Sequence, residues 1–401
     1  MEGAKVEPVD DVVGPRKSNG WRRLVAAGLR RSRWRPAAAA FAAALLVAAA
    51  LVAGRLADHG ADVAAIASHS LGLIGTKSNT LVGQIPLEAR SGQVAAGEGA
   101  VWVANAEEGT VARVDPAARR MVQRVPVDRE PAGVVAGGGA VWVANSGDRS
   151  VSWINPTTNT VVKTVPVGNG PTGIALGHGA VWVANSLDNS VSRIDPDTGQ
   201  VVGTVPVGGT PSGVAVGLGA VWVTNATDGT VSRISPTRQP VVRSIPVGNG
   251  PRAIAVHQAG VWVANSLDGT ISRIDAATDA VVATVRVGKG LSGVAVGGGG
   301  VWAASEVGGT VTRLDPDTNG VVGAIQVGSA PVGVAVVGDA LWVATRGTPS
   351  SHRGGTLRLT SSRAGHPVSI DPVLRYNGDS QQQILLMTND GLVGGQAGGR
   401  R

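Results

Sequence analysis

Amide, carboxylate and guanidinium groups recur at fixed positions along this chain, and such groups could bind a polar ligand if the fold brings them together. Carboxylates occur at equivalent positions in Glu108, Asp188, Asp228 and Asp268. Arg252 places a cation where other copies have Ala, Thr, Ser or Val. Asparagine ends five runs of the type AVWVAN, 40 residues apart, at Asn105, Asn145, Asn185, Asn225 and Asn265. We predict that these asparagines and Arg252 bind a polar ligand or a peptide strand. The alternative is that each asparagine caps its own turn and that the charged residues are solvated.

Motifs for catalysis or for a resident metal are not found in the sequence. DPDTGQ (195–200) and DPDTNG (315–320) contain only part of a calcium-loop pattern, and we assign them to turns. The six histidines, among them His178 and His257, have no metal-ligand spacing, and the absence of cysteine excludes disulfides and thiolate sites. No Ser-His-Asp set, phosphate loop or dinucleotide fingerprint occurs. We therefore predict no catalytic residue, no metal and no cofactor.

Seven tryptophans define the elements that must position these side chains. A period of about 40 residues with four short β-rich runs is typical of a β-propeller blade. We predict an all-β, seven-bladed β-propeller over residues 66–350. Burial of one tryptophan is worth a few kcal/mol, so we interpret all seven as blade cores rather than as a ligand cage. They stand 40 residues apart, at Trp102, Trp142, Trp182, Trp222, Trp262, Trp302 and Trp342.

One unit illustrates the predicted blade. From the axis outward its strands are GIAL (173–176), AVWVAN (180–185), SVSRID (190–195) and VVGTVPV (201–207). The alternation of apolar and polar residues predicts strands, and Gly, Asn and Asp at the corners favour tight turns. In a propeller, the loops after the second and the outermost strands share one face at the axis. The candidate ligand-binding residues are therefore expected on that face.

The order of the strands predicts how the ring closes. A third and an outermost strand come first, at 71–74 and 81–86, before any innermost strand. The last innermost and second strands, within 333–345, have no such pair after them. Pairing these two ends completes a seventh blade and leaves no orphan strand edge.

An apolar segment, residues 37–54, precedes the propeller and has no charge over 18 positions. At about 1.5 Å per residue it can cross a hydrocarbon core. Arginines before it predict that residues 1–35 are cytoplasmic and that the propeller is extracytoplasmic. We expect these 35 residues to form a disordered basic tail. We predict an uncleaved, single-pass membrane anchor at 36–57; a cleaved signal peptide ending near Ala57 and a soluble Ala-rich helix are the alternatives.

Residues 1–35 hold +5 of the net charge of +7, so we predict no nucleic-acid partner.

The repeated phrase, of the type VWVANSLDGTVSRIDP, resembles YVTN-type and NHL-like bacterial propellers and streptogramin B lyase over about 70–350. The resemblance implies a seven-bladed ring. The lyase family holds magnesium and performs acid–base chemistry with acidic residues at the ends of second strands and histidines at the starts of innermost strands. We expect no lyase chemistry here, because those positions lack both. The second strands end in the five asparagines, Ser305 and Thr345, and the innermost strands start with Ala132, Thr172, Ser212, Arg252, Ser292 and Val332.

The C-terminal segment, 351–401, resembles the opening of oligopeptide-type extracellular solute-binding proteins. GGTLR, then IDP, then DGLV appear in that family's order. That family needs several hundred further residues to build its cleft, so we expect a truncated segment without one. Alternatively, TLRL (356–359) adds a strand near the ring closure.

These features favour a membrane-anchored, extracytoplasmic propeller that binds a ligand or protein partner without catalysis, as a sensor or an accessory to solute or peptide uptake. A lyase-like enzyme acting at the axial face is the first alternative. A structural scaffold, whose similar blades reflect recent duplication, is the second.

Overall fold

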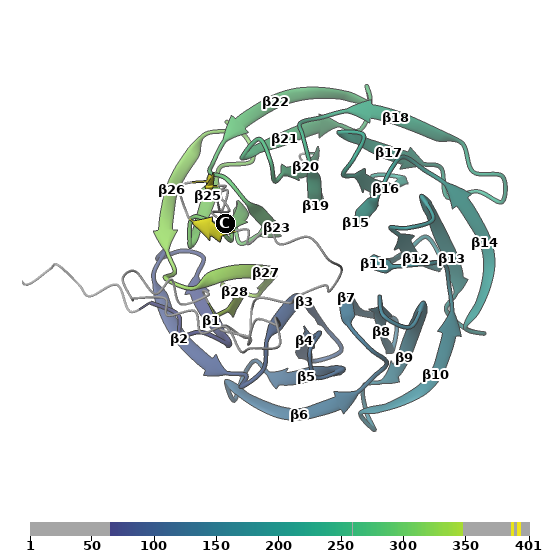
Figure 1. Cartoon of the computed structure of the whole chain (residues 1–401), viewed down its shortest axis with the longest axis horizontal. Coiled ribbons are helices and arrows are strands. Elements are labelled where there is room, and N and C mark those ends of the chain that lie inside the picture. Colours follow the sequence, from purple (N-terminus) through teal and green to yellow (C-terminus); the bar gives the residue numbers. More distant parts are fainter. Residues whose placement is uncertain (1–64, 259, 348–385, 389–390, 394–401) are drawn as a thin grey trace, which may run out of the picture. The chain divides into compact units, whose positions relative to one another are not determined.

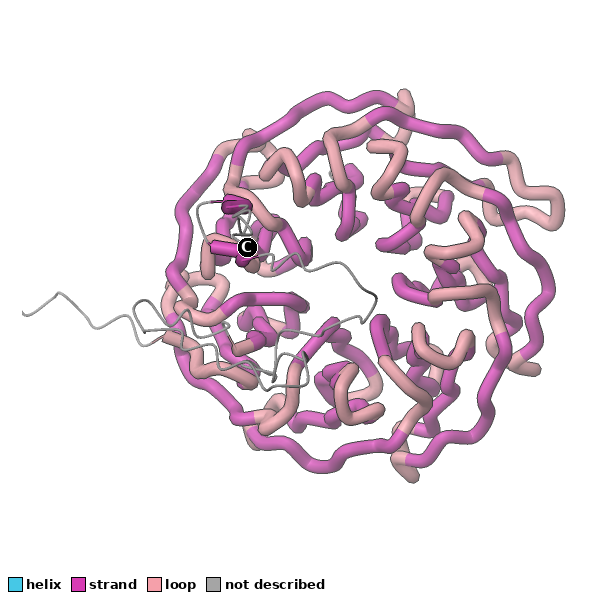
Figure 2. The backbone as a smooth tube through the Cα atoms, viewed as in Figure 1, coloured by secondary structure: helices cyan, strands magenta, loops and turns pink. Residues whose placement is uncertain are grey.

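The computed structural model describes residues 65–258, 260–347, 386–388 and 391–393. Within these residues the chain forms seven four-stranded antiparallel sheets and one short two-stranded sheet, and it contains no helix. The seven sheets form a ring, each with one strand at the axis and one at the rim (Figure 1, Figure 2). The predicted all-β, seven-bladed propeller is confirmed.

Several predicted segments lie outside the described residues. The chain divides into two compact units, Met1–Ala64 and Ala65–Arg401. The first holds the whole of the predicted basic tail and of the predicted anchor, and neither is described. Of the segment 351–401, only β29 (Leu386–Thr388) and β30 (Gly391–Val393) are described. In the part of the chain that the structure describes, no helix is long and apolar enough to cross a bilayer.

Six blades are built from four consecutive strands each, and the seventh from both ends of the ring. The first three are β3 (Ser91–Gly97), β4 (Ala100–Asn105), β5 (Thr110–Asp115), β6 (Arg120–Pro126); β7 (Pro131–Gly137), β8 (Ala140–Asn145), β9 (Ser150–Asn155), β10 (Thr160–Pro166); β11 (Pro171–Gly177), β12 (Ala180–Asn185), β13 (Ser190–Asp195), β14 (Gln200–Pro206). The next three are β15 (Pro211–Gly217), β16 (Ala220–Asn225), β17 (Thr230–Ile234), β18 (Val242–Pro246); β19 (Pro251–His257), β20 (Gly260–Asn265), β21 (Thr270–Asp275), β22 (Ala280–Arg286); β23 (Leu291–Gly297), β24 (Gly300–Ser305), β25 (Thr310–Leu314), β26 (Val321–Gln326). The closing blade has β1 (Ser70–Gly75), β2 (Leu81–Pro86), β27 (Ala330–Val337) and β28 (Ala340–Arg346).

Local sequence explains the turns between these strands. Asp195 ends β13, and its Oδ1 accepts hydrogen bonds from the backbone N–H groups of Asp197 and Thr198 at 2.9 and 3.1 Å. An Asx side chain bonded to its own following backbone stabilises a tight turn. At the end of the same turn in other blades, Asn159 and Asn319 adopt the left-handed conformation with φ of 57° and 61°. Asparagine tolerates that conformation better than most residues, so it can take the place that glycine has in the blade of Asp195, at Gly199.

The closing blade is made as predicted, in the order β2-β1-β28-β27. Leu73 of β1 pairs with Trp342 of β28 in an antiparallel register. Thr345 Oγ1 donates to the carbonyl oxygen of Ser70 at 3.0 Å, and Ser329 Oγ donates to that of Ile66 at 2.8 Å. The two ends of the ring are therefore joined by both a strand ladder and side-chain hydrogen bonds, which confirms the predicted closure.

The seven tryptophans form the cores between blades. Six of them are fully buried, and Trp342 is 2% exposed. Trp182 of β12 packs with Val221 and Val223 of β16, which belong to the next blade. Each tryptophan thus fills the space between its own sheet and the following one, and the burial of all seven supports their interpretation as blade cores.

Arginines on the third strands cover five of these rings. Arg193 pairs with Trp182 across β12 and β13, and its guanidinium carbon lies 5.3 Å from the ring centroid. Its Nη1 donates to the carbonyl oxygen of Thr237 in the next blade at 3.2 Å. In the blade of Trp142, Trp153 takes the arginine's place and stacks at 4.9 Å. The stacked guanidinium therefore links each of these cores to the neighbouring blade.

Glycine lets the innermost strands approach one another closely. A Cβ built on Gly173 of β11 would lie 2.2 Å from the carbonyl oxygen of Ser212 in β15. A Cβ on Gly133 of β7 would lie 2.1 Å from the carbonyl oxygen of Thr172. These backbone contacts bring the innermost strands together around the axis, and that spacing fixes the width of the central opening.

The tryptophan cores generate a stability prediction. Trp182→Ala removes a fully buried ring between two blades, so we expect the free energy of unfolding to fall by about 3 to 5 kcal/mol. Urea denaturation followed by circular dichroism measures the change. The control is Val202→Ala on β14, where the side chain is 56% exposed and we expect a change within about 0.5 kcal/mol. Equal effects of the two substitutions would contradict the assigned role of the ring.

Candidate functional site

A cavity of about 1040 Å³ opens at the axis of the ring. Its walls come from the first residues of the innermost strands, from the loops that precede those strands, and from the loops that follow the second strands. We call the face on which it opens the axial face. Thr172, Ser212 and Arg252 line the cavity from their strand starts. Two residues further along each strand, side chains such as Ile174 and Ile254 add an apolar wall.

The five asparagines predicted to bind ligand lie at the ends of β4, β8, β12, β16 and β20, fully buried and outside the cavity lining. Asn185 Nδ2 donates to Ser190 Oγ at 3.0 Å and to Ser192 Oγ at 2.9 Å. Equivalent hydroxyls accept from the other four amides. Each amide thus ties the second strand of its blade to the third, as the turn-capping alternative expects. Their ligand contact stays a prediction, and we leave them out of the site proposed below.

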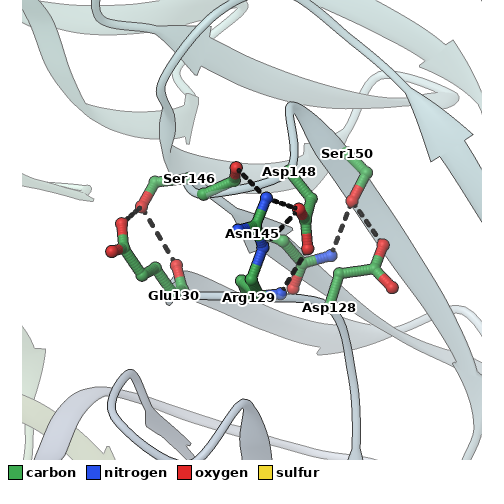
Figure 3. A network of polar contacts seen from close by, with 8 residues as sticks. Asp128, Arg129, Glu130, Asn145, Ser146, Asp148 and Ser150 are labelled. Atoms are coloured by element: carbon green, nitrogen blue, oxygen red, sulfur yellow. Dashed lines mark hydrogen bonds and ion pairs between the residues drawn. The ribbon is translucent and has the colours of Figure 1, made fainter.

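The loop carboxylates hold neighbouring loops on the axial face rather than standing free in solvent. In Figure 3, the carboxylate of Asp148 accepts hydrogen bonds from the backbone N–H and the Nε of Arg129, both at 2.7 Å. Asp188 accepts from the backbone N–H and the Nδ2 of Asn169, also both at 2.7 Å. Asp228 and Asp268 accept in the same way from the backbone N–H of Gly209 and Asn249. These bonds fix the loops that frame the cavity.

The same hydrogen bonds lower the pKa of these carboxyls. The side chain and backbone N–H of Asn169 lower the pKa of Asp188, and the side chain of Arg129 lowers the pKa of Asp148. At Asp268 the backbone N–H of Asn249 is the largest cause of a lowered pKa. Donors to the ionised form favour it, so these carboxyls stay charged at neutral pH.

Charged side chains gather on one arc of the axial face. Glu306, in the loop after β24, lies between two arginines from the blades on either side. Its Oε2 is 4.0 Å from Nη1 of Arg252, and its Oε1 is 3.5 Å from Nη1 of Arg346 at the end of β28. One blade further on, Arg90 pairs with Glu107 at 2.7 Å. Glu108, Arg129 and Glu130 continue the charged lining, whereas the lining residues from the blades of Thr172 and Ser212 carry no charge.

Arg346 is the least solvated of these cations. Its side chain is 28% exposed, and Glu306 is its ion-pair partner. Burial lowers the pKa of Arg346, and the carboxylate of Glu306 opposes that effect. The shared carboxylate compensates two guanidiniums, so the arc retains positive charge next to the cavity.

Sequence reasoning found Arg252 but missed Glu306 and Arg346. The available signal was a departure from the 40-residue register. The position that follows the second strand is small in the first five copies and charged in the last two: Ala106, Ser146, Ser186, Ala226, Ser266, Glu306 and Arg346. A column-by-column comparison of the repeat would have singled out this pair.

The magnesium site implied by the lyase resemblance has no matching ligand set in the described part of the chain. Among those residues, no group of three or more His, Cys, Asp or Glu side chains is placed to hold a metal ion. His178 lies in the turn between β11 and β12, and His257 ends β19; neither lines the axial cavity. The start of each innermost strand carries the residue types that the sequence indicated, and none is histidine.

The lowered carboxyl pKa values generate a pH prediction. A folded-state pKa below the unfolded value, about 3.9, adds stability above that value, and the contribution is lost as pH falls through the folded pKa. We expect the difference in unfolding free energy between the wild type and Asp188→Asn to be largest near pH 7 and to shrink below about pH 4. Urea denaturation at a series of pH values measures it. A difference that does not vary with pH would contradict the assigned hydrogen bonds.

The ring resembles those of several solved structures. A streptogramin B lyase structure is 17% identical, covers 64% of this chain and 91% of its own, and superposes with a TM-score of 0.57. Virginiamycin B lyase from Staphylococcus aureus is 16% identical over 69% of this chain and 98% of its own, with a TM-score of 0.56. Kuenenia stuttgartiensis hydrazine synthase, 18% identical over 62% and 89%, also scores 0.57. At these identities the likeness shows the fold alone, and no curated protein matches.

The family model is more specific than the structural neighbours. The model of the virginiamycin B lyase family matches residues 84–346, which extend from β2 to the end of β28. That range covers more than half of the chain and nearly all of the ring. The chain belongs to the virginiamycin B lyase family.

Proposed function

We propose that this protein is a non-catalytic binding module, and that its ligand or protein partner enters the axial cavity. The observation that carries the proposal is the asymmetry of the axial face. Seven similar blades would give a symmetric rim, but Arg252, Glu306 and Arg346 break the repeat on neighbouring blades. The cavity volume, about 1040 Å³, lies at the upper end of the range common for small-molecule sites. An asymmetric, partly apolar pocket argues against the scaffold alternative.

A lyase-like enzyme is the second candidate, and family membership favours it. Against it stands the chemistry of the rim. The resemblance implies carboxylates and histidines that hold magnesium, and the equivalent strand ends carry buried amides and hydroxyls. The described residues also include no cluster of metal-binding side chains. Binding without turnover is therefore the function that the rim supports best.

The cellular setting of the module is part of the proposal. The apolar run 37–54, with arginines before it, supports a single-pass anchor that leaves the propeller outside the cytoplasm. The resemblance of 351–401 to solute-binding proteins supports a role as a sensor or as an accessory to solute or peptide uptake. Both ideas rest on the sequence.

A ligand screen tests the proposed function. The full-length protein is heated with short peptides, sugars, cell-wall fragments, divalent metals or quinupristin, a ligand seen with an inactive form of the Staphylococcus aureus lyase. A ligand present at 100 times its dissociation constant should add about 2.7 kcal/mol to the free energy of unfolding. We expect a ligand other than quinupristin to raise the melting temperature, and Ala132→Trp, in the cavity lining, to abolish the rise.

The matched control is Val202→Trp on the outermost strand β14, which leaves the cavity open and should keep the rise. Consumption of quinupristin with magnesium present would overturn the proposal in favour of the lyase. A panel without any stabilising ligand would favour the scaffold. A rise that survives Ala132→Trp would place the ligand elsewhere and contradict the assigned site.

A further inference from the structure

The two arginines beside Glu306 have unused hydrogen-bonding capacity. A guanidinium has five N–H donors, and a charge-assisted bond to a carboxylate is about 2.7 to 2.9 Å long. The distances from Glu306 to Arg346 and Arg252 are 3.5 and 4.0 Å, too long for such bonds. Among the described residues, neither guanidinium takes part in a hydrogen bond, although the Arg346 side chain is only 28% exposed. Donors in this state favour binding of an anion.

The arc also carries more positive than negative charge at the cavity. Glu306 is the ion-pair partner of both Arg252 and Arg346, whereas Glu107 pairs with Arg90 alone, at 2.7 Å. These five side chains sum to one net positive charge. The charged residues that line the cavity sum to the same value; they are Arg90, Arg129, Arg252 and Arg346 against Glu107, Glu108 and Glu130. Low local hydration strengthens the attraction of the arc for an anion, since the Arg346 side chain is mostly shielded from water.

The wall next to the arc is apolar. Ile254 follows Arg252 by two positions on β19, and Val294 and Val334 occupy the same place on β23 and β27. All three line the cavity and are 8% exposed. A ligand that reached the arginines would thus lay the rest of its surface against aliphatic side chains, where burial of apolar area is favourable.

We propose that the axial cavity binds a ligand with one carboxylate on an apolar body, such as the C-terminus of a short apolar peptide. Arg252 and Arg346 donate to the carboxylate, Ile254, Val294 and Val334 contact the apolar body, and Glu306 competes with the ligand for the two guanidiniums. This inference rests on the proposed function, because it names the ligand class for the same cavity.

The test uses calorimetric titration of the full-length protein with matched probes. The probes are acetyl-Leu-Leu, its C-terminal amide, which has the same body without the charge, and acetate, which has the charge without the body. Octanoate separates a fatty acid from a peptide as the source of the carboxylate. We expect acetyl-Leu-Leu to bind at least about 10-fold more tightly than the amide, and acetate not to bind measurably.

Substitutions on the arc give the second arm of the test. Arg252→Gln and Arg346→Gln should each weaken binding of acetyl-Leu-Leu by about 10-fold or more, whereas Glu306→Gln should strengthen it because the competing carboxylate is gone. Arg346→Lys keeps the charge but not the fork of donors, so it should fall between the wild type and Arg346→Gln. The control is Arg243→Gln on the outer strand β18, 67% exposed, which should leave binding unchanged.

The outcomes separate this inference from the proposed function. Equal affinity for the acid and the amide would overturn carboxylate recognition and leave a cavity that binds ligands by other means. Unchanged binding in both arginine variants, or weaker binding in Glu306→Gln, would also overturn it. Because the comparison of acid with amide needs no variant, it decides the question even if a substitution unfolds the ring. The ligand screen above, rather than this titration, decides the proposed function.

Discussion

The ring depends on the burial of one large aromatic side chain between each pair of neighbouring blades. A four-stranded sheet leaves two faces to cover, and here Trp182 packs with Val221 and Val223 of the following sheet. The guanidinium of Arg193 then covers the indole and reaches the next blade. Since no blade can bury its own face alone, stability is shared between neighbours, as in other repeat architectures.

Because the ring is stabilised between blades, residues on the axial rim can vary. The side chains that stabilise the ring lie inside the blades or tie one loop to the next, as Asp188 does with Asn169. The residue that follows each second strand is less constrained: Ser146 and Ser186 donate to the preceding loop, but other blades have Ala226, Glu306 or Arg346 there. Departures from the repeat can therefore accumulate there without loss of the fold, and they give the cavity its asymmetry.

The fold could be predicted in detail from the sequence because the same pattern of strand and turn residues recurs in all seven blades. Predicted strands 180–185 and 190–195 coincide with β12 and β13, and the closure through β1 and β28 is confirmed. The contacts of the candidate site were harder to predict from the sequence. Asn185 and its equivalents share one face in the pattern, but no pattern says that an amide points into its own blade. Likewise, the bond from Asn169 to Asp188 joins loops 19 residues apart, and the pairing of Glu306 with Arg346 joins neighbouring blades around the axis.

The closing blade also sets an order of events during synthesis. Ser70 and Thr345 are bonded to each other yet lie 275 positions apart in the chain. At the usual 5 to 20 residues per second, about 14 to 55 s pass between the appearance of one partner and that of the other. During that interval the apolar side chains in and beside β1 and β2 can pack against the next blade, as Leu71 and Leu87 do with Val101, but β1 lacks its ladder partner β28 and keeps one strand edge exposed. An exposed edge of this kind is a template for pairing with a second copy of the chain, so the late arrival of β28 is the step that removes it.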